Sequence, residues 1–273
     1  MPRRINFRRR PKMSAFSVDG FFVGQVSPSL PCPVCRGGQL QFLEGNLQTV
    51  PDAAYNKEVK ADPDWEPGWL RYSFSGFLVC DNLKCKGKVV VAGRMESGTD
   101  HYQVGPNEWE EENFKKCFPK YFDRPPEIIP LDDHIPAELR EVLIESFRLF
   151  WLDAPSCANK IRTCVELLLN QFDVARYARR KKKRVPISLD SRIKDFALKN
   201  PDVSEKLLAV KWIGNAGSHP GTLSKEDLLD GYRILNYSLK KLFANDDAEI
   251  HRLTKQINKR KRPISLTRRK PQF

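Results

Sequence analysis

The sequence predicts an α+β protein, with a β-rich N-terminal zinc ribbon followed by an all-α helical bundle. Two pairs of cysteines lie among short segments that alternate apolar and polar residues before residue 95. After residue 137, apolar residues recur every three or four positions, which is typical of helices with one buried face. The 273 residues are 40% hydrophobic, which is enough for one large or two medium domains with real cores.

The first 136 residues divide into three predicted parts. Residues 1–30 are expected to form a basic arm. Residues 31–95 are expected to form a zinc-ribbon-like unit that contains a long insertion, and residues 96–136 are expected to be a packed linker because they are rich in proline and aromatic residues. The candidate strands of the ribbon are residues 39–43, 72–79 and 88–93.

Two close cysteine pairs, each followed by glycine, predict a metal site. Zinc takes four thiolates in a tetrahedron, and a tight turn presents two of them from positions three apart. We therefore predict a structural Zn²⁺ ion bound by Cys32, Cys35, Cys80 and Cys85, with no position left open for catalysis. Four unrelated reduced thiols are the alternative, whereas disulfides are less expected because we predict a cytoplasmic protein.

The helical bundle is expected to cover residues 137–245. A first helix spans 137–152, and Asp153 and Pro155 have the residue types of an N-cap and a first turn for the second helix. A third helix covers about 189–199, and Asn200 with Pro201 starts the fourth. Ser224 and Asp227 have the pattern of a capping box at the start of the fifth helix. Residues 246–273 are expected to form a basic C-terminal tail.

The end of the fourth helix is the candidate polar site. Helical spacing places Lys211, Asn215 and His219 on one face, because residues four apart are neighbours. Gly214 and Gly217 cost roughly 1 kcal/mol each relative to alanine in a helix. Either a close helix contact or a functional surface is expected to offset that cost.

Positive charge is concentrated in three segments, and the net charge is +13. Residues 1–12, 179–184 and 252–270 hold 21 of the 47 Lys and Arg residues and no acidic residue. The rest of the chain therefore has 26 basic and 34 acidic residues. Such clustering favours a sequence-independent contact with RNA or DNA over the alternative of solubilising tails. The predicted nucleic-acid-binding residues are Arg179, Arg180, Lys181, Lys182, Lys183, Arg184, Lys259, Arg260, Lys261 and Arg262.

No apolar run approaches the roughly 20 residues that a membrane span needs. The basic N-terminus is not followed by the apolar stretch of an export signal. We therefore expect a cytoplasmic protein without a membrane partner.

Arg162 and Glu166 are four apart on an early predicted helix, and Gly214, Asn215 and His219 follow on a later one. In these residues the helical half resembles a known bacterial family, domain-of-unknown-function family 4145. The resemblance covers about residues 137–245. That family is regarded as related to the HEPN superfamily of helical domains, many of which are metal-independent ribonucleases or toxins of phage defence. A cysteine zinc ribbon is a common companion.

The resemblance implies roles for five residues in a ribonuclease. His219 would be the general acid/base, Asn215 a positioning donor, and Arg162 with Glu166 a supporting pair. Lys211 stands where the family usually has arginine, and lysine lacks the planar bidentate grip on phosphate. The alternatives are that His219 caps its helix, that Arg162 and Glu166 are a structural pair, and that Lys211 is a solvated surface residue.

Three functions are compatible with these features. The preferred hypothesis is a nucleic-acid-binding accessory or adaptor protein of a bacterial phage-defence or restriction-type system, with a protein partner in that system. The second is a metal-independent HEPN-like ribonuclease or toxin that uses His219, and the third is a structural protein-interaction module. The small residues on the fourth helix also suggest a homodimer.

Overall fold

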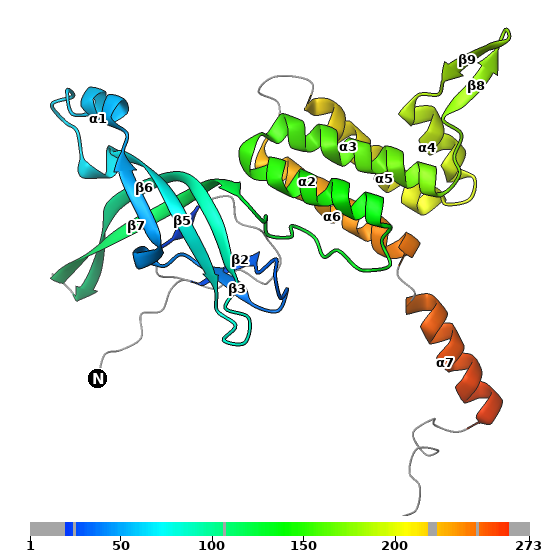
Figure 1. The fold of residues 1–273 in the computed structure, drawn as a ribbon, viewed down its shortest axis with the longest axis horizontal. Coiled ribbons are helices and arrows are strands. Elements are labelled where there is room, and N and C mark those ends of the chain that lie inside the picture. Colours follow the sequence, from blue (N-terminus) through cyan, green and yellow to red (C-terminus); the bar gives the residue numbers. More distant parts are fainter. Residues whose placement is uncertain (1–19, 24–25, 106–107, 218–222, 244–245, 262–273) are drawn as a thin grey trace, which may run out of the picture.

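The protein consists of an antiparallel β-sheet from the N-terminal half beside a group of helices from the C-terminal half (Figure 1). The computed structural model describes residues 20–23, 26–105, 108–217, 223–243 and 246–261. No helix among these residues combines the length and apolarity that a membrane crossing requires.

Seven strands form the sheet in the order β1-β7-β6-β5-β3-β2, with β4 paired to the other half of β5. All neighbours are antiparallel. The strands are β1 Phe21–Phe22, β2 Val26–Pro31, β3 Gln39–Gln41, β4 Leu47–Pro51, β5 Arg71–Cys80, β6 Lys88–Gly105 and β7 Glu108–Phe122. Short helical segments between them are η1 Glu44–Asn46, α1 Ala53–Val59 and η2 Pro67–Trp69.

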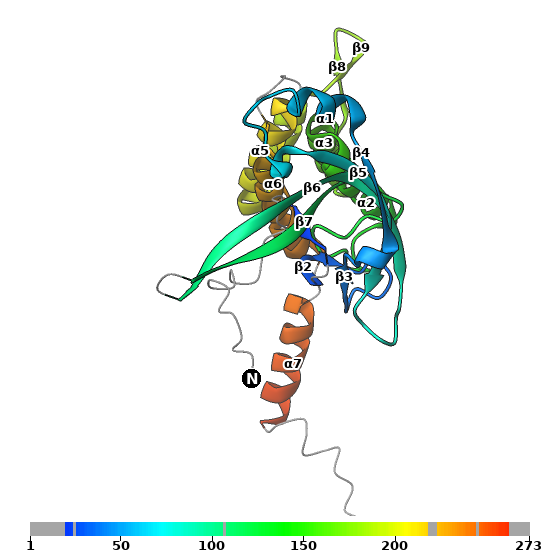
Figure 2. The ribbon, with the colours of Figure 1, turned by 90° about the vertical axis from the view of Figure 1, so that its left-hand side faces the viewer.

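The sheet curls into a half-barrel, and two irregularities accompany the curl (Figure 2). Gly76 in β5 has φ of +157°, and a side chain there would overlap the carbonyl of Asn46. In the β6–β7 ladder, Ala92 pairs with Tyr121 but Gly93 pairs with Pro119, so Lys120 is the extra residue of a β-bulge. Bulges bend the strand and increase its twist, which helps an open sheet to curl.

The predicted zinc ribbon followed by a HEPN-like bundle is therefore wrong as a description of the fold. The cysteine turns belong to a larger half-barrel that spans residues 21–122, not to a separate ribbon of residues 31–95. The predicted linker of residues 96–136 contains all of β7 and the second half of β6, and among its described residues only 123–136 lack helix and strand. Its glycines and acidic residues are tolerated because β6 and β7 extend beyond the core as a hairpin, which Figure 2 shows in profile. Pro119 is buried and lies beside the bulge, a position at which a sheet accepts proline.

The C-terminal half is helical, as expected, and its first helix has the predicted bounds. The helices are α2 Ala137–Leu152, α3 Ala154–Gln171, α4 Leu189–Ala197, α5 Pro201–Ala216, α6 Lys225–Phe243 and α7 Asp246–Arg260. Asp153 accepts a hydrogen bond from the backbone N–H of Ser156 at 2.9 Å, so it is the predicted N-cap. Ser224 and Asp227 exchange the two hydrogen bonds of a capping box, at 3.1 and 2.8 Å.

The basic segment after α3 is a β-hairpin, which the helical periodicity of this half did not predict. Helix α3 ends at Gln171, and strands β8 Tyr177–Arg180 and β9 Lys183–Pro186 pair antiparallel. Lys181 and Lys182 form the turn with φ of +47° and +65°. Positive φ at both central residues is the geometry of a type I′ turn, which matches the twist of two paired strands.

One core runs through both halves. Trp151 of α2 is buried, and its ring lies 5.0 Å from that of Phe122 and 6.1 Å from that of Phe21, both in the sheet. On the helical side the same ring contacts Phe150 at 5.2 Å. Burial of aromatic side chains contributes roughly 2–3 kcal/mol each, so the two halves stabilise one another.

Candidate metal centre and the polar face of helix α5

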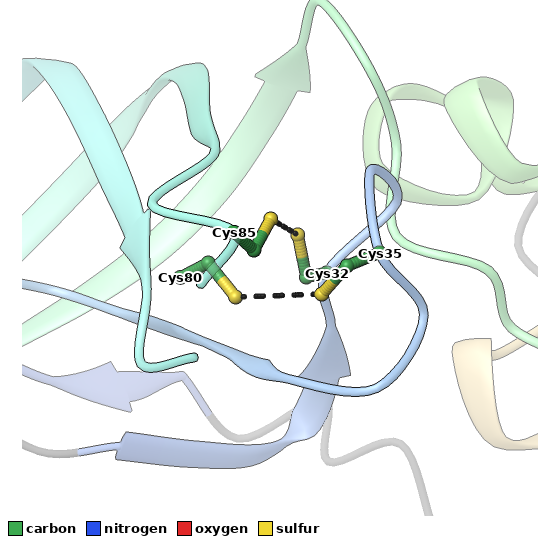
Figure 3. Close-up of side chains that lie close together, drawn as sticks. All are labelled: Cys32, Cys35, Cys80 and Cys85. Carbon is green, nitrogen blue, oxygen red and sulfur yellow. Dashed lines mark hydrogen bonds between the residues drawn. The ribbon is translucent and has the colours of Figure 1, made fainter. Parts of the chain in front are cut away.

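The four cysteines predicted to bind metal lie together at one end of the sheet (Figure 3). Cys32 and Cys35 come from the turn between β2 and β3, Cys80 is the last residue of β5, and Cys85 comes from the turn between β5 and β6. Their sulfur atoms all lie within 4.8 Å of one another, with Cys32–Cys85 at 3.9 Å and Cys35–Cys80 at 3.7 Å. A disulfide requires about 2.05 Å, and all four thiols are free.

The two turns share a backbone design. The N–H of Cys32 donates to the carbonyl of Gly38 at 2.8 Å, and the N–H of Cys80 donates to that of Gly87 at 2.9 Å. The residue after the second cysteine has a positive φ in both turns, +56° at Arg36 and +48° at Lys86. This conformation turns the chain back so that both sulfurs of a pair face the same side.

The second pair has four residues between its cysteines where the first pair has two, and the backbone position of Asn82 accounts for the difference. In the first turn the N–H of Arg36 donates to the carbonyl of Cys32, whereas in the second the N–H of Lys86 donates to that of Asn82 at 3.1 Å. Asn82 thus has the backbone position that Cys32 has, and Cys80 lies two residues earlier. The N–H of Asn82 donates to the sulfur of Cys80 at 3.4 Å.

Burial and hydrogen bonds set the acidity of the thiols. Burial raises the pKa of Cys80 to about 12. Burial also raises the pKa of Cys35, but the N–H groups of Gly37 and Gly38 and the thiols of Cys85 and Cys80 together lower it to about 7. Of these two thiols, Cys35 therefore deprotonates at the lower pH. A bound cation would draw the others into the thiolate form, because only thiolates are metal ligands.

This cluster can hold a metal ion by its geometry and by its ligand type. Four thiolates suit a soft cation with tetrahedral coordination. Cys32 and Cys80 are buried, and an ion held by all four cysteines would have no position left for a substrate or a water. The arrangement fits a structural role and not a catalytic one.

The polar face predicted on α5 is arranged differently from the expectation. Lys211 is neither a solvated surface residue nor free to meet a phosphate: it is 8% exposed, and its Nζ donates to Oδ1 of Asp190 at 2.8 Å. Asp190 lies on α4 and also pairs with Lys194 at 2.8 Å. Hydrogen bonds from Lys194 and Lys211 lower the pKa of Asp190 to about 2. Sequence analysis missed Asp190, since nothing in the sequence links it to a residue 21 positions away.

The two glycines of this stretch lie in a close contact between α5 and α3. A side chain at position 214 would lie 2.6 Å from Cβ of Arg162, and one at position 217 would lie 2.8 Å from Cβ of Ala158. Of the two explanations for these glycines, the close helix contact is confirmed.

The remaining residues of the predicted site are partly placed. Arg162 pairs with Glu166 at 3.5 Å as the i,i+4 spacing predicts, and both side chains are about two-fifths exposed. Asn215 is half-buried, and no hydrogen bond joins it to Arg162 among the described residues. His219 lies outside the described residues. Of the predicted site residues, the structure thus pairs Arg162 with Glu166, whereas Lys211 pairs with Asp190, which was not predicted.

The basic residues predicted to bind nucleic acid lie at two places. Arg179, Lys181, Lys182, Lys183 and Arg184 are exposed on the β8–β9 hairpin, which projects from the helical half (Figure 1). Arg180 belongs to the same hairpin. Lys259, Arg260 and Lys261 lie exposed at the end of α7, and Arg262 lies outside the described residues.

The hairpin carries an aromatic residue that the prediction did not include. The guanidinium of Arg184 lies 3.9 Å from the ring centre of Tyr177, whose side chain is 42% exposed. An open hollow of about 680 Å³ is lined by this tyrosine and by Arg176, Arg179, Lys182 and Arg184. Its only charged lining groups in the described structure are cationic.

Comparison with known proteins finds two family models that match separate parts of the chain. Residues 21–122, which include the whole half-barrel and all four cysteines, match a family described as Domain of unknown function (DUF8608). No curated protein and no solved structure matches the chain. Residues 145–260 match a family described as Domain of unknown function (DUF4145), so the resemblance of the helical half to that family is confirmed.

Proposed function

We propose that this protein is a nucleic-acid-binding accessory protein, in which the β8–β9 hairpin contacts phosphates and the four cysteines hold a structural zinc ion. The observation that carries the proposal is the hairpin itself. Five exposed basic residues are concentrated on a projecting two-stranded ribbon, although the chain outside its three basic segments has more acidic than basic residues.

The shape and charge of the hairpin suit a polyanion. Lys181 and Lys182 at the turn and Arg179 and Arg184 on the strands are not engaged in ion pairs with other described residues. Cations of this kind bind phosphates by releasing condensed counterions, which supplies most of sequence-independent affinity. Tyr177 adds an aromatic face on which a base can stack, a contribution of roughly 1–3 kcal/mol in other proteins.

Zinc is the metal that fits the cysteine cluster. Zn–S bonds of about 2.3 Å in a regular tetrahedron place the sulfurs roughly 3.8 Å apart. The two close sulfur pairs of the cluster lie at 3.7 and 3.9 Å. Zinc would hold the β2–β3 turn against the β5–β6 turn and so fix one end of the half-barrel.

Binding is favoured over RNA cleavage by the position of Lys211. The ribonuclease alternative needs this cation to stabilise charge on a phosphate, but its ammonium group is buried against Asp190. Accessory function needs nothing from Lys211 or His219.

The salt dependence of binding to RNA and DNA tests the proposal. In the hairpin variant, Arg179→Gln and Arg184→Gln remove strand charges, and Lys181→Asn with Lys182→Gly removes turn charges while keeping residues that suit a type I′ turn. Loss of four phosphate contacts should weaken affinity strongly and reduce the slope of log K against log salt by up to about four.

A variant with the same change in charge is the matched control. Lys57, Lys199, Lys240 and Lys241 are exposed lysines away from the hairpin, and changing all four to glutamine gives an equal loss of charge. This control should keep most of the affinity. If the control and the hairpin variant lose affinity equally, binding reflects net charge alone and the hairpin is not the binding element.

The zinc proposal has its own measurement. Metal analysis of the purified protein should give close to one zinc ion per chain, and a thiol-specific reagent should release it. A protein that contains no zinc after purification, and takes up none when it is supplied, contradicts the assignment.

A further inference from the structure

A second cationic site lies at the junction between the half-barrel and the helices. It is a cavity of about 180 Å³, distant in sequence from the basic hairpin and independent of the proposed function. Aromatic and positively charged side chains both line it. The aromatic lining residues are Phe21, Phe118 and Trp151, and the charged ones are Arg94, Lys120 and Lys225.

The three cations come from three different elements. Arg94 lies on β6, Lys120 on β7, and Lys225 is the first residue of α6. Lys120 is also the extra residue of the bulge opposite Ala92 and Gly93. A bulge changes the direction of a strand side chain, and bulges are frequent beside functional sites.

The charges in this cavity are poorly compensated. Arg94 pairs with Glu96 at 3.0 Å, but Lys120 and Lys225 form no ion pair with any residue in the described part of the chain. Burial, and next the charge of Lys120, lower the pKa of Lys225, while the neighbouring Glu226 opposes this with a smaller effect. Like charges at such a place cost stability unless an anion offsets them.

Aromatic rings compensate Lys225 only in part. Its Nζ lies 5.4 Å from the ring centre of Trp151 and 5.5 Å from that of Phe150. These cation–π contacts contribute about 0.5–2 kcal/mol in other proteins, but a ring carries no net charge. The cavity therefore keeps a net positive charge.

We propose that this cavity binds a phosphoryl group, held by Lys120 and Lys225 with Arg94 at its edge. A tetrahedral oxyanion can offer an oxygen to each of three cations that line one cavity from three different elements. The volume of about 180 Å³ corresponds to roughly six water molecules, which is enough for a phosphoryl group. The sheet residues belong to the 21–122 match, and Trp151 and Lys225 to the 145–260 match. The bound anion thus links the two parts, and neither part forms the site alone.

Thermal unfolding and tryptophan fluorescence of the full-length, metal-loaded protein test this proposal with inorganic phosphate as the probe. Sodium chloride at the same ionic strength is the reference. Phosphate should raise the unfolding temperature of the wild type beyond the chloride reference. It should also change the fluorescence, because Trp151 lines the cavity.

Two variants assign the effect to the cavity. Lys225→Met keeps the apolar stem against the rings, and Lys120→Gln changes an exposed residue, so neither should prevent folding. Each should weaken phosphate binding at least about ten-fold, as expected when a charge-assisted hydrogen bond is lost. Without phosphate, Lys225→Met should be as stable as the wild type or more stable. Lys57→Gln on α1 is the control and should respond as the wild type does.

Further probes identify the source of the phosphoryl group. If glycerol phosphate stabilises the protein as much as inorganic phosphate does, the ligand is a small phosphorylated molecule. If a 5′-phosphorylated oligonucleotide competes with inorganic phosphate and the same oligonucleotide with a 5′-hydroxyl does not, the ligand is the end of a nucleic acid. Either outcome supports the site. The proposal is overturned if the wild type shows no phosphate shift beyond the chloride reference, or if both variants shift as much as the wild type does.

Discussion

The cysteine cluster and the polar face of α5 were both predicted as sites, but the structure brings all of the predicted residues together only in the cysteine cluster. All four cysteines converge at one point, within 4.8 Å. On α5, Lys211 turns to Asp190, and Arg162 pairs within its own helix. The difference teaches that closely spaced ligands in two turns define a site locally, whereas a polar helix face acquires its role from the helices packed against it.

The cysteine cluster should show the largest response to substitution. Cys32→Ser removes one of four ligands, and structural zinc can contribute on the order of 10 kcal/mol to folding. We expect loss of the bound zinc and unfolding of the half-barrel, measured by metal analysis and circular dichroism. Cys164→Ala, at a buried thiol of α3 outside the cluster, should retain the metal. Equal metal content in the two variants would contradict the assignment.

The contact between α3 and α5 should be the most sensitive feature of the helical half. Gly214→Val places a branched side chain where Cβ alone would lie 2.6 Å from Cβ of Arg162. Overpacking of this kind costs about 1–3 kcal/mol, measured as a lower free energy of unfolding in urea. Gly231→Ala on α6 is a milder control, because its Cβ meets only the end of the Ile213 side chain at 3.3 Å. An unchanged free energy of unfolding for Gly214→Val would mean that the two helices can move apart without cost.

Lys211 should behave as a structural residue. Lys211→Met removes a buried hydrogen bond to a charged group and leaves Asp190 with Lys194, which should cost about 1.5–3 kcal/mol. Lys206→Met is the more accessible comparison, because this side chain is 32% exposed and pairs with Asp202 and Glu205 at the surface, where ion pairs contribute roughly 0–1 kcal/mol. Nucleic-acid affinity should not change in either variant. A loss of affinity with unchanged stability in Lys211→Met would instead support a functional cation.

The same ion pair predicts a pH dependence. The pKa of Asp190 is lowered from its ordinary value of 3.8 to about 2, so its stabilising effect is present above pH 4 and is lost as the pH falls towards 2. The difference in unfolding free energy between wild type and Asp190→Asn should therefore shrink over this range. A difference that stays constant from pH 5 to pH 2 would show that the carboxylate is not held by the two lysines.

The smallest effect is expected for the pair that the family resemblance emphasised. Glu166→Gln breaks an exposed i,i+4 ion pair of 3.5 Å, and such pairs contribute about 0.3–0.5 kcal/mol. Thermal unfolding should shift by a degree or two at most. A much larger loss would show that the pair supports more than its own helix.

The sequence predictions were accurate where a structure depends on residues close together in the chain, and less accurate where it depends on distant ones. The first helix, the Asp153 cap and the Ser224–Asp227 capping box were predictable because each depends on residues within four positions. Strand β6 was predicted only for residues 88–93, and its remainder and β7 were missed, because their hairpin extends beyond the core and therefore lacks a continuous apolar alternation. The short segment Gly105 to Glu108 between them was the available signal for a hairpin.

The sequence by itself determined which four cysteines form the cluster, the helical half and the clustering of basic residues, because these depend on local spacing and composition. Only the tertiary structure decided that the cysteine turns belong to a half-barrel, that Lys211 pairs with Asp190, and that Arg94, Lys120 and Lys225 meet in one cavity. Each of these depends on contacts between residues more than 20 positions apart. Such contacts follow from which elements pack together, and no local pattern of side chains specifies that.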